Sequence, residues 1–322
     1  MPPFRPSLWL PGGHLQTVGA VRHHSRPRLN SRLLLHELPD GDSIGLHDEF
    51  PSGWQPGDRS FVLFHGLCGC HGSSYMIRLA ERFASQGARV FRVDMRGCGS
   101  VHARCAQLTH AGRSDDVLEA MGRVALETGE GPILAVGVSL GGNQLLRALG
   151  RVAAGLDMRP EWFDRLEKAV AIAPPIDLFR CSNNMQRITL RPYNWYFIRL
   201  LLRRIPPQVE NRKEFRDALK QGRPATLLEL DDRFTAPLSG FRGAHHYYGE
   251  SSARQWMDRI DVPVRVLVAQ DDPIVPVGCY LDDRQRFSDA VELMVARRGG
   301  HVGYLDRRGE YWMDEVIDDW CR

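Results

Sequence analysis

The segment Gly137-Val138-Ser139-Leu140-Gly141 is a G-x-S-x-G motif, in which a serine stands between two glycines. A short apolar run at 132–138 precedes the serine, and a helical pattern begins directly after it. A sharp turn from strand to helix exposes the serine hydroxyl as a nucleophile and leaves no room for a Cβ on either side. The following helix would also direct the positive end of its dipole at developing negative charge. We predict that Ser139 is a catalytic nucleophile; a purely structural turn with an idle serine is the alternative.

A serine hydroxyl needs a base, and the base needs a group that orients it. Around a turn of this kind the chain order is serine, then Asp or Glu, then histidine. Nine of the twelve histidines precede Ser139, and two more lie at 245 and 246, ahead of the candidate acids. His301 alone follows a late apolar run, in the glycine-rich loop Arg297-Arg298-Gly299-Gly300-His301. We therefore predict that His301 is the base, with a structural histidine as the alternative.

Two carboxylates stand where the orienting acid is expected, because Asp271 and Asp272 directly follow the apolar run 262–269. A buried carboxylate at this point would hold the imidazole tautomer and stabilise the imidazolium. One of the two can instead cap the turn before Pro273. We prefer Asp272, which is nearer to the Pro-Ile-Val-Pro bend, and Asp271 stays open.

Stabilising an oxyanion takes two backbone N–H donors. One is expected from Leu140, the residue after the nucleophile, and the other from the loop His65-Gly66-Leu67 after an early strand. Gly66 permits a tight turn, so we assign Leu67 as the second donor. We expect His65 to brace this loop.

The elements that would position these residues alternate between strands and helices, which is typical of a mostly parallel sheet covered on both faces. Catalytic groups on such sheets lie at the carboxyl ends of the strands. The first thirty residues look irregular, and two strands are expected around Asp40-Gly41. Ser114 is expected to cap its helix. The remaining predicted strands are 60–65, 88–94, 132–138, 168–173, 262–269 and 291–296, and the predicted helices are 74–86, 114–128, one from Leu140 and one from about Glu310.

The segment 177–259 interrupts this alternation and is rich in Arg, Asn, Pro and aromatic residues. We predict a single domain whose core is 1–176 and 260–322, with 177–259 inserted as a helical cap or lid over the pocket. Within it, 193–205 is expected to be a helix that packs its apolar side on the core. A lipid-facing lid, with arginines flanking a broad apolar surface, is the alternative.

Composition excludes several classes of function. A net charge of +3, with 43% hydrophobic and 25% charged residues, is that of an ordinary globular protein without a nucleic-acid-binding stripe. Seven irregularly spaced cysteines and the lack of a secretory signal indicate reduced thiols in a cytoplasmic protein. No apolar run approaches the roughly 18 residues that a membrane span needs. Cys68-Gly69-Cys70-His71 lacks a second pair of zinc ligands, and the loop 94–100 lacks a phosphate-binding motif. We therefore expect no metal and no cofactor.

Several motifs stand in fixed order along the chain: HLQT (14–17), HGLCGCHGSSY (65–75), DMRGCGS (94–100), GVSLGGN (137–143), RPYNWYF (191–197), FTAPLSGF (234–241), YYGESSA (247–253), AQDDPIVP (269–276) and GGHVGY (299–304). Taken together, they make the chain similar, nearly end to end, to the YheT-like α/β-hydrolases, bacterial relatives of the plant EMB-type proteins and of the mammalian hydrolase-domain lipases. The resemblance implies the α/β-hydrolase fold and a triad of Ser139, an aspartate of the 271–272 pair, and His301. It also implies hydrolysis of esters, acylglycerols or phospholipids, with acyl transfer to alcohols in some members. Eukaryotic members usually carry an N-terminal membrane anchor, and we expect none in this chain.

The sequence thus predicts a serine esterase or lipase that acts on a small-molecule acyl ester through a catalytic triad and an oxyanion hole. Medium or long acyl chains are expected from the apolar cap. An acyltransferase using the same triad and a non-catalytic binding protein on the same fold are the alternatives; a haloalkane-type dehalogenase would need an acid in place of Ser139. We expect a monomer or small homo-oligomer, without nucleic acid and without stable membrane insertion, whose lipid contacts are transient.

Overall fold

A computed structural model of the 322-residue chain describes residues 3–22, 30–282 and 286–322. Its centre is one eight-stranded sheet with the strand order β1-β2-β4-β3-β5-β6-β7-β8. β1 pairs antiparallel with β2, and β2 pairs antiparallel with β4, whereas every other neighbouring pair is parallel. The strands are β1 (Arg32–Glu37), β2 (Ser43–Glu49), β3 (Ser60–Phe64), β4 (Arg89–Asp94), β5 (Ile133–Val138), β6 (Leu166–Ile172), β7 (Val264–Ala269) and β8 (Val291–Ala296).

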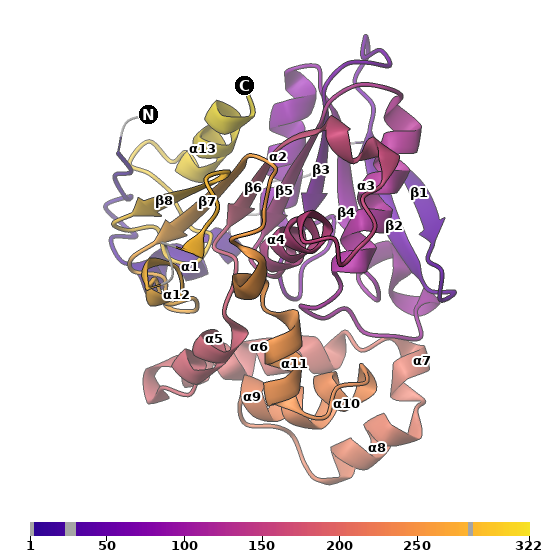
Figure 1. Ribbon diagram of the computed structural model, residues 1–322. Coiled ribbons are helices and arrows are strands. Elements are labelled where there is room, and N and C mark those ends of the chain that lie inside the picture. Colours follow the sequence, from indigo (N-terminus) through magenta and orange to yellow (C-terminus); the bar gives the residue numbers. More distant parts are fainter. Residues whose placement is uncertain (1–2, 23–29, 283–285) are drawn as a thin grey trace.

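Helices cover both faces of the sheet, as expected for strands that are apolar on both sides. On one face, α3 (Ser114–Thr128) and α4 (Leu140–Ala153) pack against alternate residues of the central strands. On the other face lie α2 (Ser74–Ser85) and α13 (Trp312–Cys321). The expected class, an α/β sheet flanked by helices, is confirmed (Figure 1).

The segment between β6 and β7 adds helices and no strand to the described part of the chain. Figure 1 shows these helices gathered at one end of the sheet. Many of their apolar side chains pack among themselves, in a small core that includes Ile198, Phe215 and Phe234. The helices are α5 (Leu178–Met185), η3 (Ile188–Leu190), α6 (Arg191–Arg203), α7 (Pro207–Glu210), α8 (Lys213–Lys220), α9 (Leu227–Leu230), η4 (Asp231–Thr235), α10 (Ala236–Leu238), α11 (Ala244–Ser251) and η5 (Ala253–Trp256).

Two local expectations are wrong. The first thirty residues are not irregular throughout, because Gly13–Arg22 form the helix α1, while 23–29 lie outside the described residues. Ser114 is the first residue of α3 rather than its cap; Arg113 stands at the cap position and makes no capping side-chain bond. The Ser114 hydroxyl instead accepts a hydrogen bond from Arg147. The remaining short helices are η1 (Gly99–Arg104), η2 (Glu161–Arg165) and α12 (Gly278–Leu281).

Candidate active site

Ser139 stands at the turn between β5 and α4 with a positive φ of 52°, which few residues other than glycine adopt. The flanking glycines are required by the packing. A Cβ on Gly137 would lie 2.6 Å from the carbonyl oxygen of Gly141, and one on Gly141 would lie 2.7 Å from that of Phe64. The chain therefore makes the strained turn that the motif predicts, and the serine is held by its backbone N–H, which donates to the carbonyl of Ile172 over 2.8 Å.

The imidazole of His301 lies between the serine and a carboxylate. Its Nε2 is 2.9 Å from the Oγ of Ser139, and its Nδ1 is 2.8 Å from Oδ2 of Asp272. Ser139 follows β5, Asp272 follows β7 and His301 follows β8, so three parallel strands deliver the three side chains to one edge of the sheet. The Asp272 side chain is only 2% exposed and that of His301 is 11% exposed. The structure thus joins the predicted nucleophile, base and acid in one hydrogen-bonded line.

The two adjacent aspartates have different hydrogen-bond partners, which gives them different roles. Asp272 turns Oδ2 to His301, while its Oδ1 accepts the backbone N–H groups of Ile274 and Val275 over 2.8 and 3.0 Å. Asp271 instead accepts the N–H of Gly300 over 2.9 Å. The geometry favours Asp272 as the partner of the imidazole and gives Asp271 the task of fixing the loop that carries it.

The expected oxyanion donors lie on either side of the serine. Leu140 is the first residue of α4, so its N–H belongs to the helix end that has no partner within the helix. Gly66 packs directly on the serine, since a Cβ there would lie 3.1 Å from the Ser139 Cβ. The N–H of Gly66 donates to the Tyr75 hydroxyl over 2.8 Å, which leaves Leu67 as the donor candidate of this loop. Burial raises the pKa of Tyr75 to about 12 and keeps that hydroxyl neutral.

His65 braces the same loop, as expected. Its Nε2 accepts the N–H of Met95 at 3.3 Å, so Nδ1 carries the proton and donates to the carbonyl of Gly66 over 2.8 Å. Burial lowers the pKa of His65, so the ring stays neutral and can accept one hydrogen bond while it donates the other.

Helix α1 supports the His301 loop, a contact that the sequence did not predict. The Oγ1 of Thr17 accepts the N–H of His301 over 2.8 Å and donates to the carbonyl of Gly13 over 2.7 Å. Gln16 makes hydrogen bonds to both backbone groups of Leu305, at 2.8 and 2.9 Å. The motif HLQT therefore holds a histidine that lies more than 280 residues further along the chain. Nothing in the sequence of the HLQT motif itself predicts that it supports His301.

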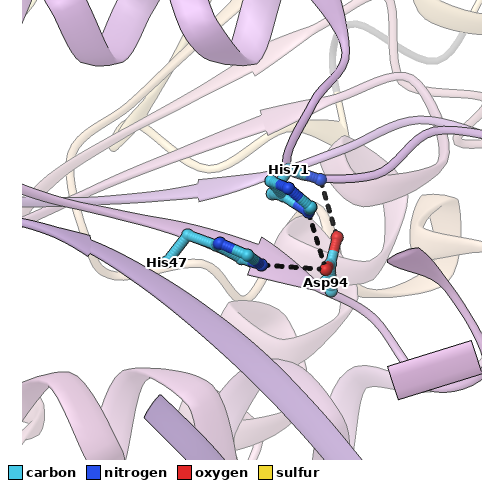
Figure 2. A group of neighbouring side chains, drawn as sticks. All are labelled: His47, His71 and Asp94. Atoms are coloured by element: carbon cyan, nitrogen blue, oxygen red, sulfur yellow. Dashed lines mark hydrogen bonds and ion pairs between the residues drawn. The ribbon is translucent and has the colours of Figure 1, made fainter. Parts of the chain in front are cut away.

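Two histidines and one aspartate form a second polar cluster, in which His71 belongs to the loop after β3 (Figure 2). His47 of β2 and His71 both point to Oδ2 of Asp94, at 3.1 and 2.8 Å, and the N–H of His71 donates to Oδ1 over 2.7 Å. Burial by itself would raise the pKa of Asp94, but the hydrogen bonds from both histidines and from backbone N–H groups hold it well below its ordinary value. Asp94 therefore ties β2 and the loop after β3 to the end of β4.

These three residues are of the types that bind divalent cations, and their ligand atoms lie within 4.8 Å of one another. Two features favour a hydrogen-bonded brace instead. Oδ2 of Asp94 is already surrounded by four donors, two of them from Ser100 at 2.7 and 2.8 Å. The nitrogens that would bind an ion, Nε2 of His47 and Nδ1 of His71, already face Oδ2 of Asp94, and the two rings are stacked at 3.4 Å with 12° between their planes. The expectation of no metal stays a prediction.

A cavity of about 270 Å³ lies where the helices after β6 meet the sheet edge. Asp272 and Pro273 line it from the sheet side, and His14, Arg187 and Leu190 line it from α1 and the inserted segment. The inserted segment also reaches the Leu67 loop, because the guanidinium of Arg204 donates to the carbonyl of Cys68. The motif FTAPLSGF lies in this segment, where Phe234 is buried and Phe241 packs on Tyr247.

Comparison with known proteins agrees with this geometry. The family model described as alpha/beta hydrolase fold matches residues 59–308. The chain belongs to the α/β-hydrolase family. It is 29% identical to YheT of Escherichia coli (strain K12), named as an esterase, over 98% of this chain and 92% of that protein. It is 23% identical to the human phospholipase ABHD3, over 98% of this chain and 77% of that protein.

Among solved structures, the Pyrococcus furiosus esterase Pf2001 superposes with a TM-score of 0.59 at 15% identity, over 92% of this chain and 95% of that one. At that identity the likeness shows the fold alone. The expected resemblance to the YheT-like proteins is confirmed, and it extends to the plant EMB8 protein of Picea glauca, at 25% identity over 98% of this chain and 71% of that protein. The family makes this chain a member of the hydrolase superfamily.

Proposed function

We propose that this α/β-hydrolase is a serine esterase or lipase that cleaves carboxylic esters in two steps through an acyl-enzyme. The observation that carries the proposal is the line from Ser139 through His301 to Asp272, with contacts of 2.9 and 2.8 Å. A hydroxyl within reach of an imidazole that a buried carboxylate orients is an activated nucleophile. The esterase and lipase names of relatives over nearly the whole chain add support.

In the first step the Oγ of Ser139 attacks the ester carbonyl while Nε2 of His301 takes its proton. Asp272 stabilises the imidazolium and holds the tautomer. The oxyanion is bound by the N–H groups of Leu67 and Leu140, and collapse of the intermediate passes the proton to the leaving alcohol. Water, activated by the same imidazole, then releases the acid.

The inserted segment serves in this proposal as a cap over the site, with the core at 1–176 and 260–322 and the cap at 177–259. A cavity lies beside Asp272, and the medium or long acyl chain expected from the apolar residues of this segment stays a prediction. In the described ranges, no helix has both the length and the apolar character that crossing a bilayer requires. The cytoplasmic location and the oligomeric state expected from the sequence stay predictions.

A series of p-nitrophenyl esters of increasing acyl length tests the proposal. We expect the wild type to hydrolyse them and Ser139→Ala to lose at least ~10³-fold in kcat, because removing a triad member usually costs that much or more. Ser85→Ala is the matched control, since Ser85 is exposed at the far end of α2. Equal turnover by wild type and Ser139→Ala would refute the assignment.

A further inference from the structure

The exposed face of α6 carries a row of basic and aromatic side chains. Arg191, Trp195, Arg199 and Arg203 follow one another at intervals of four residues and so lie along one side of the helix. All four are exposed; Trp195 is 62% exposed. The guanidinium of Arg199 lies 5.3 Å from the centre of the Trp195 ring. We call these four residues the α6 ridge.

The α6 ridge is not the side by which this helix packs on the rest of the chain. The opposite side of α6 is already packed, with Leu201 against the small core of the inserted segment. Asn194 is also buried there, and it donates to the carbonyl of Met185 over 2.7 Å and accepts the N–H of Leu227 over 2.8 Å. The helix is therefore anchored on one side and presents the ridge to its surroundings.

Charge on this surface is strongly one-sided, although the whole chain carries only +3. Residues 178–209 contain no Asp or Glu. Within the described ranges, Arg187 and the three arginines of the ridge form no ion pair. Unpaired guanidinium groups on a fixed helix are complementary to a surface of negative charge.

The ridge also lies next to the candidate active site. Arg187, Thr189 and Leu190 line the cavity that Asp272 borders, and α6 begins at the next residue. Ile188, between them, is 71% exposed. Tyr193 in the first turn of α6 contacts His14 of α1 through its hydroxyl, at 3.1 Å. The ridge therefore begins beside the rim of this cavity.

We propose that the α6 ridge docks the protein reversibly on an anionic lipid surface. Exposed tryptophan and arginine on one face of a helix, with its other face held in the protein, is the composition that rests at the boundary between headgroups and acyl chains. An acidic protein would match the charge of the arginines. It would not offer an apolar environment for the exposed side chains of Trp195 and Ile188. Binding to lipid does not depend on the proposed esterase activity. The further idea, that docking presents an ester to Ser139, rests on the proposed esterase activity.

Vesicle binding by the full chain tests the proposal in a Ser139→Ala background, so that no lipid is consumed. We expect the protein to sediment with vesicles of phosphatidylcholine and phosphatidylglycerol and much less with phosphatidylcholine alone. The double variant Arg191→Glu/Arg199→Glu should lower the partition coefficient at least about tenfold, since each basic residue near an anionic surface contributes roughly fivefold. Trp195→Ser should lower it severalfold.

Arg216→Glu is the matched control, an exposed arginine on α8 of the same segment, and it should change the partition coefficient by less than about twofold. Each variant is also made with Ser139 intact. Hydrolysis of a soluble short-chain ester at the wild-type rate shows that the variant is folded. If the esterase proposal is wrong, the wild type fails this assay too, and the vesicle result is unaffected. The docking proposal is overturned by absence of binding to both vesicles, by equal binding to both, or by an α6 double variant that binds as tightly as the Arg216 variant. The first of these would leave an acidic protein as the partner to test.

Discussion

At the scale of single residues, the site depends on a serine that the fold holds in an unfavourable backbone conformation. Ser139 has a φ of 52°, and the close contacts at Gly137 and Gly141 leave no space for a side chain on either neighbour. Such strain persists only where the surrounding structure imposes it, and it is common at reacting groups. Here β5 and α4 impose it, and the result is a hydroxyl that points at His301.

The two neighbouring aspartates lead to a prediction that separates orientation of the base from support of its loop. Asp272→Asn keeps an acceptor for Ile274 and Val275 but places an amide against Nδ1 of His301, which favours the wrong tautomer. We expect kcat for ester hydrolysis to fall by ~10²- to 10⁴-fold. Asp271→Asn retains an acceptor for Gly300 and should lose less than about tenfold. Similar losses in the two variants, or a larger loss for Asp271→Asn, would contradict this division of roles between the two carboxylates.

At the scale of elements, α1 and the loop that carries His301 function as a unit. Thr17 bridges them with one hydroxyl, and a Cβ on Gly300 would lie 2.2 Å from the carbonyl oxygen of Gly13. The pairing is tight enough that the position of the imidazole depends on a helix from the other end of the chain.

Replacing Thr17 tests this dependence. Thr17→Val leaves the N–H of His301 without its acceptor, so we expect kcat to fall by about tenfold, the equivalent of ~1–2 kcal/mol, with KM nearly unchanged. Thr17→Ser keeps the hydroxyl and should restore most of the rate. A valine variant as active as wild type, or a serine variant as impaired as the valine variant, would show that the bridge does not position the base.

The strands and helices of the sheet could be predicted because their signals are local: buried runs such as 132–138 and the helix pattern at 114–128 are periodic in themselves. Ser139 could be placed from a local motif, and His301 from the chain order expected around that motif. α1 could not, because it lacks a clear apolar face and is stabilised by Leu305 and His301, residues distant in sequence. The choice between Asp271 and Asp272 likewise needs the direction of each carboxylate, which two adjacent identical residues do not encode.

At the scale of the whole molecule, the helices between β6 and β7 are held by a partly buried polar group. Asp231 accepts a hydrogen bond from the Tyr248 hydroxyl over 2.7 Å, and that hydroxyl also lies 3.1 Å from the Oγ of Ser182. Burial raises the pKa of Asp231 to about 6, against the opposing effect of the Tyr248 bond. The fold therefore carries a carboxylate that is costly to ionise.

This carboxylate makes stability depend on pH. Between about pH 4 and pH 6 the folded chain binds a proton at Asp231 that the unfolded chain does not, so this group's contribution falls as pH rises and its cost is complete above pH 6. We expect Asp231→Asn to raise the free energy of unfolding at pH 7.5 by on the order of 2 kcal/mol. The gain should shrink as pH falls from 6 to 4. Urea unfolding of both proteins across this range measures the gain. A gain that is constant with pH, or a loss at pH 7.5, would contradict the raised pKa of Asp231.

The central claim, that Ser139 is the nucleophile activated by His301, is tested most directly by covalent labelling with a fluorophosphonate and mapping of the adduct by mass spectrometry. We predict one adduct per chain, on Ser139, in the wild type, and a rate of labelling at least ~10²-fold lower in His301→Ala, which lacks the base. No adduct on the folded wild type, or an adduct on another residue while Ser139 stays free, would contradict the claim.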